Sequence, residues 1–249
     1  DYEVYYEPFL GGGSVALHIT KKYPKLKIVV NDLYEPLYNF WLQLQVNGDY
    51  VHDQLQQLKS RFPDRGSARG LFLDAKEKLY NLDVSDKDRA VCFYIINKCS
   101  FSGLTESSSF SEQASDANFS MRGIDKLPVY SKLIEDWYIT NVDYRHLLGD
   151  KEKTFIYLDP PYDIKDNLYG KKGSIHKKFD HDNFAKACEI YNSEMLISYN
   201  SDQLVKDRFK DWNCAEFDLT YTMRSVGEYM RNQKIRKELL LFNYNIGVF

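Results

Sequence analysis

Four consecutive residues, Asp159, Pro160, Pro161 and Tyr162, bring together groups that could hold the exocyclic amine of a base. They follow an apolar run at 155–158 that is typical of a buried strand, and two prolines cannot continue its hydrogen-bonded ladder. A rigid turn past the strand end would present the Asp159 carboxylate, the Pro160 carbonyl and the face of Tyr162. The alternative interpretation is an ordinary Asp-Pro turn beside a buried tyrosine.

This set of groups suits the alkylation of an amine nitrogen. The lone pair of such a nitrogen is delocalised into the base, so the nitrogen is a poor nucleophile. Acceptors that bind both N–H groups favour tetrahedral geometry and aim the lone pair at an electrophile. The ring of Tyr162 could stack a base that has left a duplex. No covalent intermediate is needed, so neither a catalytic cysteine nor a metal site is expected.

A second set of residues could bind a nucleotide-like ligand near the start of the chain. Three glycines at 11–13 lie between an expected strand at 4–6 and an expected helix at 15–23, where glycine permits positive φ and close backbone approach. About 20 residues later, Asp32 follows a second expected strand at 26–30, where its carboxylate could accept hydrogen bonds from ribose hydroxyls. NAD sites and S-adenosylmethionine sites share this pattern, and a structural tight turn is a third interpretation.

Two details bear on the ligand of this loop. No Lys-Ser or Lys-Thr pair follows the glycines, which disfavours a P-loop for phosphates. Glu7 lies just before the glycines, where it would repel a pyrophosphate but tolerate a sulfonium with an amino-acid tail. The loop therefore favours S-adenosylmethionine over a dinucleotide.

The elements that must position these residues follow an alternating α/β pattern at both ends of the chain. Further strands and helices of this pattern are expected at 154–158, 184–191, 195–199, 203–209, 215–223 and 237–244. We expect Asp182 and Asp202 to cap the two helices. The middle of the chain carries long helical patterns and a polar loop at 100–120. We therefore predict a catalytic domain of residues 1–35 and 139–249, with residues 36–138 inserted in it.

The composition, 43% hydrophobic and 28% charged, is typical of a soluble globular protein, and no apolar run is long enough to span a membrane. A net charge of −3 disfavours bulk nonspecific binding of nucleic acid but leaves a local basic face open. The four cysteines lack metal-type spacing and are expected to be reduced thiols in the cytosol. The chain begins at Asp1, close to a motif, so a preceding segment is expected.

Taken in order, the motifs resemble those of the Dam-type, D12 class N6-adenine-specific DNA methyltransferases. The matching stretches span nearly the whole chain and are 7–14 (EPFLGGGS), 31–32 (ND), 97–98 (NK), 101–104 (FSGL), 159–162 (DPPY) and 197–200 (ISYN). The resemblance implies methyl transfer from S-adenosyl-L-methionine to N6 of a flipped-out adenine in duplex DNA. It also implies a Rossmann-like methyltransferase sheet, doubly wound with an antiparallel C-terminal strand, and an inserted, mainly helical target-recognition domain.

The resemblance also assigns residues. Asp159, Pro160 and Tyr162 would hold the target adenine. The cofactor would be bound by Glu7, Phe9, Gly11, Gly13, Asp32, Asp143 and Asp159. DNA contacts are expected from polar and basic residues of three segments. The insertion provides Lys98, Ser100, Ser102 and Arg122. The lysine-rich segment after the prolines provides Lys171 and Lys172, and the hairpin before the last strand provides Arg224 and Arg231. The family also has an N-terminal Gly-Lys segment, which this sequence does not contain.

The expected partner is double-stranded DNA and not a membrane, bound by a monomer or a dimer in the cytoplasm of a prokaryotic or phage-infected cell. Two other functions stay open, an NAD-dependent Rossmann oxidoreductase and a non-catalytic DNA-binding relative. The sequence does not reveal the recognition site, for which the resemblance implies a GATC-like palindrome. It also does not distinguish a restriction-modification enzyme from a phage or an orphan enzyme.

Overall fold

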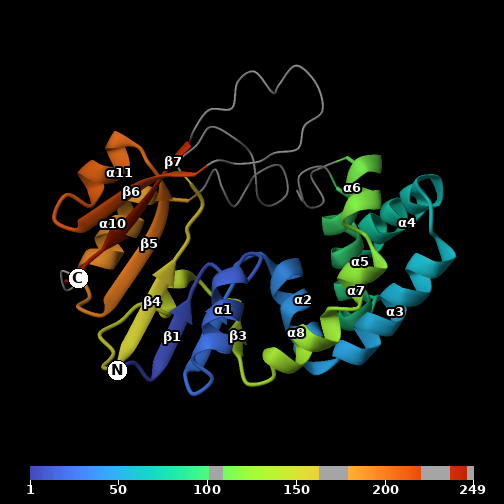
Figure 1. Ribbon diagram of the computed structural model, residues 1–249, viewed down its shortest axis with the longest axis horizontal. Helices are drawn as coiled ribbons and strands as arrows, with labels where there is room; N and C mark the ends of the chain where they lie inside the picture. Colours follow the sequence, from blue (N-terminus) through green and yellow to red (C-terminus); the bar gives the residue numbers. More distant parts are fainter. Residues whose placement is uncertain (101–108, 163–178, 220–235, 246–249) are drawn as a thin grey trace.

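The computed structural model describes residues 1–100, 109–162, 179–219 and 236–245. Figure 1 shows a twisted sheet at one end of the molecule and a block of helices at the other. The described strands form one seven-stranded sheet in the order β3-β2-β1-β4-β5-β7-β6. Their bounds are β1 Val4–Glu7, β2 Lys27–Asn31, β3 Tyr138–Thr140, β4 Thr154–Leu158, β5 Glu194–Asn200, β6 Asn213–Leu219 and β7 Arg236–Phe242.

The strand directions give the class of the sheet. β1 pairs in parallel with β2 and β4, and the parallel pairing continues to β3 on one side and to β5 on the other. β7 lies between β5 and β6 and is antiparallel to both. This is the doubly wound sheet with an antiparallel C-terminal strand that the sequence predicted. The strand order reverses between β1 and β4, and ligands of such sheets bind at the carboxyl ends of the strands at this point.

Residue types explain why the inner strands of the sheet are covered. Four of the five β2 residues, Ile28 to Asn31, are buried, as is typical of an inner parallel strand. β5 alternates instead, and Met195 and Ile197 turn their side chains to one face. That face packs on the helices near the end of the chain, where Phe184 is fully buried. The opposite face packs on the first helix and on the helical block.

The described helices are α1 Ser14–Lys22, α2 Glu35–Val46, α3 Gly48–Arg61, α4 Arg65–Lys78, α5 Asp86–Cys99, α6 Glu112–Ala117, α7 Met121–Ile124, α8 Leu127–Leu133, the 3-10 helix η2 Tyr144–His146, α10 His181–Glu189 and α11 Gln203–Arg208. None of them is long and apolar enough to cross a membrane. All four cysteines are free thiols.

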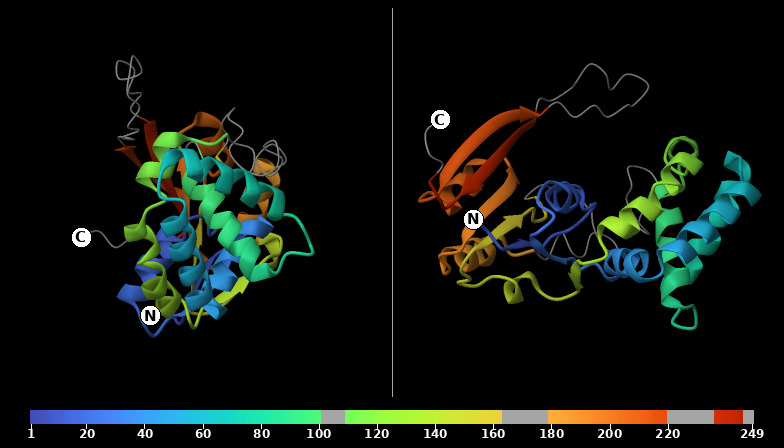
Figure 2. Two further views of the ribbon diagram at one scale, coloured as in Figure 1. Left: turned by 90° about the vertical axis from the view of Figure 1, so that its right-hand side faces the viewer. Right: turned by 60° about the horizontal axis from the view of Figure 1, so that its bottom comes forward.

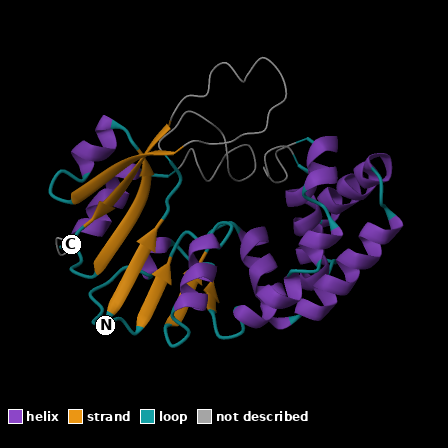
Figure 3. Ribbon diagram, in the orientation of Figure 1, coloured by secondary structure: helices purple, strands orange, loops and turns teal. Residues whose placement is uncertain are grey.

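Helices α2 to α8 lie between β2 and β3 in the chain and form the block that Figure 3 shows beside the strands. The central helix α5 is buried along one continuous stretch, from Ala90 to Ile96. A single hydrophobic cluster joins Tyr5 and Ile28 of the sheet to Phe72 and Phe93 of the block. The right-hand view of Figure 2 places the block and the β6–β7 pair at opposite ends. The block is therefore packed on the sheet through a shared core, and its status as a separate domain stays a proposal.

Two local predictions were wrong. The expected polar loop at 100–120 contains helix α6, whose first turn is capped by the Ser111 hydroxyl. The cap of α10 is Asp180, whose carboxylate accepts a backbone N–H of the first turn at 2.9 Å. Asp182, the predicted cap, lies inside that turn and pairs with Arg208 at 2.6 Å.

Candidate active site

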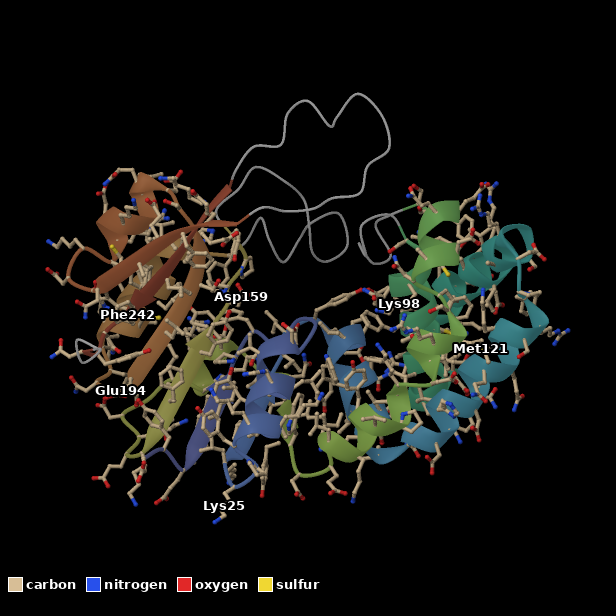
Figure 4. All side chains as sticks on the ribbon, viewed as in Figure 1. Lys25, Lys98, Met121, Asp159, Glu194 and Phe242 are labelled. Carbon is tan, nitrogen blue, oxygen red and sulfur yellow. The ribbon has the colours of Figure 1, made fainter. Side chains whose placement is uncertain are left out.

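The predicted motifs meet at the carboxyl edge of the sheet. Glu7 ends β1, Asn31 ends β2 and Asn200 ends β5, while Asp159 directly follows β4. Figure 4 shows Asp159 at the upper end of the strands, whereas Lys25 and Glu194 mark the opposite edge. The glycine loop after β1 and the turn after β4 therefore flank the point where the strand order reverses.

The glycine loop has a backbone that requires glycine. Gly11 and Gly13 have φ values of 50° and 66°, in the left-handed region that most side chains avoid. The indole N–H of Trp41 on α2 donates to the carbonyl of Gly11 at 3.1 Å. A Cβ on Gly13 would lie 2.7 Å from a ring carbon of the same Trp41, so a larger residue does not fit. A Cβ on Gly11 or Gly12 would meet no heavy atom within 4 Å, which leaves space beside the loop.

Asp32 is tied to this loop by its carboxylate. One oxygen accepts the N–H of Gly11 and the other accepts the N–H of Tyr34, each at 2.9 Å. Burial raises the pKa of Asp32 to about 6, although both hydrogen bonds act to lower it. A carboxylate can accept about four hydrogen bonds, so each oxygen keeps capacity for a donor from a ligand.

The side chain of Asn31 joins the loops that follow the first three strands of the fold. Its amide donates to the carbonyls of Pro8 and Val142, both at 3.0 Å. Its oxygen accepts the N–H of Val142 at 2.9 Å. This bridge fixes Asp32 relative to the loop that carries Asp143.

Glu7 is a buried acid behind the glycine loop, with only 2% of its surface exposed. The hydroxyl of Tyr5 donates to it at 2.6 Å. Burial raises the pKa of Glu7 to about 8, and the negative charge of Asp159 adds to the rise. A direct contact between Glu7 and a cofactor stays a prediction.

Phe9 and Asp143 are the remaining residues that were predicted to bind the cofactor. The Phe9 ring packs against Tyr144 and Phe184, with ring centroids 5.3 and 5.9 Å apart. The carboxylate of Asp143 caps η2 and pairs with the Arg145 guanidinium at 2.7 Å, which lowers the pKa of Asp143. Both side chains of this ion pair are partly exposed, and such pairs rearrange at small cost.

The turn after β4 holds the two residues on which the amine chemistry depends. Asp159 is exposed on one side, yet loss of solvation by the atoms packed around it raises its pKa to about 6. The negative charge of Glu238 is the second cause of this rise. Tyr162 donates its hydroxyl to Glu238 at 2.9 Å, and the Ser198 hydroxyl lies 3.2 Å from the same oxygen. Its ring is stacked on Tyr199, with centroids 6.0 Å apart and planes 24° apart.

Asn200, which pairs with Glu238 across β5 and β7, has a buried acceptor. Its side-chain oxygen is buried and has no hydrogen-bond partner among the residues that the structure describes. Buried polar atoms of this kind are uncommon in folded proteins. A ligand with an N–H or O–H donor would supply the missing bond.

Three of the predicted DNA-binding residues are described. Lys98, in the last turn of α5, is half-buried over the Tyr94 ring, and burial lowers its pKa. Ser100 is fully buried and donates to the carbonyl of Asn97 at 3.4 Å, so a contact with DNA would require this segment to rearrange. Arg122 is exposed on α7. The others lie outside the described residues: Ser102, Lys171, Lys172, Arg224 and Arg231.

Comparison with known proteins decides the family. The family model of the D12 class N6 adenine-specific DNA methyltransferases matches residues 1–223. The chain belongs to this family. It is a site-specific DNA adenine methyltransferase, and the alternative of an NAD-dependent oxidoreductase is excluded.

Two curated relatives of this methyltransferase carry type II methyltransferase names. The chain is 23% identical to type II methyltransferase M1.LlaDCHI of Lactococcus lactis subsp. cremoris over 262 residues, covering 98% of this chain and 87% of the relative. It is 26% identical to type II methyltransferase M.MjaIII of Methanocaldococcus jannaschii over 177 residues, covering 64% of this chain and 58% of the relative. Among solved structures, precorrin-6y C5,15-methyltransferase from Geobacter metallireducens GS-15 matches with 9% identity and a TM-score of 0.37, covering 98% of this chain and 81% of that one.

Two residues of the methyltransferase site were missed from the sequence. Trp41 lies on a helix that was assigned to the insertion, and nothing local indicates that it supports the glycine loop. Glu238 is the one acid of β7, directly precedes the apolar run Leu239–Phe242 and is only 5% exposed. Its position beside that run indicates a buried carboxylate that requires a polar partner, but it does not indicate which residue that partner is.

Proposed function

We propose that the enzyme transfers a methyl group from S-adenosyl-L-methionine to N6 of an adenine flipped out of duplex DNA. The observation that carries this proposal is the position of the turn after β4. It puts the carboxylate of Asp159 and the ring of Tyr162 at the same sheet edge as the glycine loop and Asp32. Acceptors for an amine and a loop for a methyl donor thus lie on either side of the strand-order reversal.

The residues of the loop fit the methyl donor. The space beside Gly11 and Gly12 admits close approach of a ligand to the backbone. Asp32 keeps acceptor capacity for two ribose hydroxyls, as its backbone bonds use one site on each oxygen. Phe9 would line the cofactor, and Asp143 would contact its adenine after release from Arg145. The bound donor supplies an electrophilic methyl group on a sulfonium.

Asp159 and Pro160 would hold the N6 amine of the target base. The last ladder pair of β4 is Leu158 with Ile197, so the Pro160 carbonyl lies beyond the hydrogen-bonded strand. Together with the Asp159 carboxylate it offers two acceptors for the two N–H groups of the amine. This geometry directs the nitrogen lone pair towards the methyl group. Tyr162 would stack the flipped adenine, which offsets part of the cost of unstacking it from the duplex.

Residues 36–138 would form the target-recognition domain, and residues 1–35 with 139–249 the catalytic domain. Lys98 fits this division, because it is a half-buried cation in the last turn of α5, within the inserted segment; Figure 4 shows it on the helical block, across from Asp159 on the sheet. The predicted contacts of the segments outside the described residues belong to the same proposal. We further infer a monomer that acts in the cytoplasm, where its four free cysteines stay reduced.

The test is a methylation map. The purified protein is incubated with S-adenosylmethionine and duplex DNA of random sequence, and modified bases are located by sequencing. We expect N6-methyladenine within one short motif, and none with Asp159→Ala. The matched control is Asp74→Ala, which removes an exposed acid of α4 that pairs only with Lys78 among the described residues and should leave the map unchanged. A modified base other than adenine would overturn the proposal.

A further inference from the structure

The strand β7 brings a buried acid to the active site from the far end of the chain. Glu238 lies 76 residues from Tyr162 in sequence, yet its carboxylate accepts the Tyr162 hydroxyl at 2.9 Å. The antiparallel register explains this contact. Asn200, the last residue of β5, pairs with Glu238, so the start of β7 lies at the carboxyl edge of the sheet.

Tyr162 is held in two ways at this edge. Its hydroxyl lies between Glu238 of β7 and Ser198 of β5, so two strands fix the position of one oxygen. One face of its ring lies along Tyr199, which is 1% exposed and itself bonded through its hydroxyl to His181. A ring held at its oxygen and along one face keeps one orientation, and a base would have to stack on the opposite face.

We propose that Glu238 is a positioning residue for methyl transfer, which acts by holding the Tyr162 ring in the orientation that receives the target adenine. The inference rests on the proposed function, since it assigns Tyr162 to the flipped base. The acceptor oxygen of Glu238 is the required feature, because it determines where the hydroxyl points. Glutamine also has an acceptor oxygen at the same distance along its side chain and should replace glutamate. A side chain without an acceptor should not.

The test is a double-mutant cycle on the full chain, read as the single-turnover rate of methyl transfer at saturating DNA and cofactor. Glu238→Met keeps the length of the side chain but removes its acceptor, and Tyr162→Phe removes the donor. Misplacement of a reacting group by about 1 Å slows catalysis by on the order of 100-fold, so we expect each variant to lose about 10-fold to 100-fold. The double variant should be no slower than the slower single variant, because both remove the same bond. A double variant whose rate loss equals the product of the two single losses would overturn the proposal.

Two further readouts separate positioning from folding. Glu238→Gln should transfer methyl groups within about threefold of the parent rate, since its amide oxygen accepts the hydroxyl. The affinity of Glu238→Met for DNA should stay within about threefold, as the loss is in the reaction step. If Glu238→Met does not fold, Glu238→Leu takes its place, and a Glu238→Gln variant as slow as either would overturn the proposal in any case.

The opposite edge of the sheet supplies a matched control. The hydroxyl of Tyr2 donates to Glu194 at the start of β5, so the same pair of groups occurs far from Asp159. Tyr2→Phe and Glu194→Met should leave the rate of transfer unchanged, and a loss like that of the Glu238 variants would overturn the proposal. An inactive parent protein would instead overturn the proposed function. If the parent is active and the rate losses of Glu238→Met and Tyr162→Phe multiply in the double variant, only this inference is overturned.

Discussion

The hydroxyl of Tyr162 lies between two side chains from different strands, Glu238 and Ser198. The sequence indicates a role only for the ring face of Tyr162, which phenylalanine would keep. In the folded chain, that replacement would leave the buried Glu238 without the hydrogen bond from Tyr162. Loss of one partner from a buried charged group is costly, and the ring would also lose its fixed orientation.

We therefore expect Tyr162→Phe to slow single-turnover transfer by about 10-fold to 100-fold. Tyr162→Ala should be slower still, since stacking of a base on an aromatic ring contributes about 1–3 kcal/mol. Fluorescence of 2-aminopurine at the target position would separate the two effects. The phenylalanine variant should still quench the flipped base, and the alanine variant should not. Parent-like rates for Tyr162→Phe would show that the hydroxyl has no role.

Titration of Asp159 should make the rate of methyl transfer fall on the acid side of about pH 6. Loss of solvation and the negative charge of Glu238 raise the pKa of Asp159 from 3.8 to about 6, so the carboxyl becomes protonated, and loses acceptor strength, as the pH falls through 6. The groups that surround it are Glu7, Tyr157, Tyr162 and Glu238. Rates measured at saturating cofactor from pH 5 to 9 should fall below about pH 6. Glu238→Gln should move this fall in rate to lower pH, and a fall near pH 4 in the parent would contradict the account.

At the scale of elements, the loops after the strands are positioned by partners that come from elsewhere in the fold. The strands before Asp159 and Asp32 could be predicted, because short apolar runs that end at an acid are visible in the sequence. The cap at Asp202 was also predicted correctly. Asp180 and Asp182 could not be distinguished, since both precede the helix and both are good caps. Glu238 could not be assigned, because the register of β5 with β7 depends on contacts that are distant in sequence.

The glycine loop gives a prediction at this scale. Gly13→Ala would place a Cβ 2.7 Å from the Trp41 ring on a backbone with φ of 66°, so both the loop and α2 would have to shift. Strained backbone of this kind costs about 1–3 kcal/mol, which should appear as a lower free energy of unfolding in urea. The control is Gly70→Ala in α4, where a Cβ meets nothing within 4 Å and alanine should stabilise the helix by up to about 1 kcal/mol. Equal stability of the two variants would contradict the assigned strain.

At the scale of the whole molecule, the fold holds three acids with raised pKa values at one sheet edge. Glu7 has a pKa of about 8, and Asp32 and Asp159 have pKa values of about 6. At a pH between the ordinary pKa of each acid and its raised pKa in the fold, the folded chain binds more protons than the unfolded chain. The free energy of unfolding should therefore fall as pH rises from about 4 to 8. Asp143 has a lowered pKa, so its contribution has the opposite sign; it is already complete at about pH 4 and is lost only as the pH falls below that value.

Glu7→Gln tests this relation. The variant keeps an acceptor for the Tyr5 hydroxyl but has no proton to lose, so it should be more stable than the parent at pH 8 and not at pH 4. We expect a gain of about 1–3 kcal/mol at pH 8, less than the full shift would give, because a buried site relaxes on ionisation. Urea unfolding at both pH values measures it. A gain that is the same at pH 4 and pH 8 would show that the buried carboxyl is not the cause.

The most direct measurement for the whole account is single-turnover methyl transfer by Asp159→Ala at saturating S-adenosylmethionine and duplex DNA, with cofactor affinity measured on the same preparation. Alanine removes the acceptor that holds the amine and leaves the strand before it unchanged. We expect the rate to fall by on the order of 100-fold or more, while cofactor affinity stays within a few-fold of the parent. A variant that transfers methyl groups within a few-fold of the parent rate would contradict the role of Asp159 and the mechanism built on it.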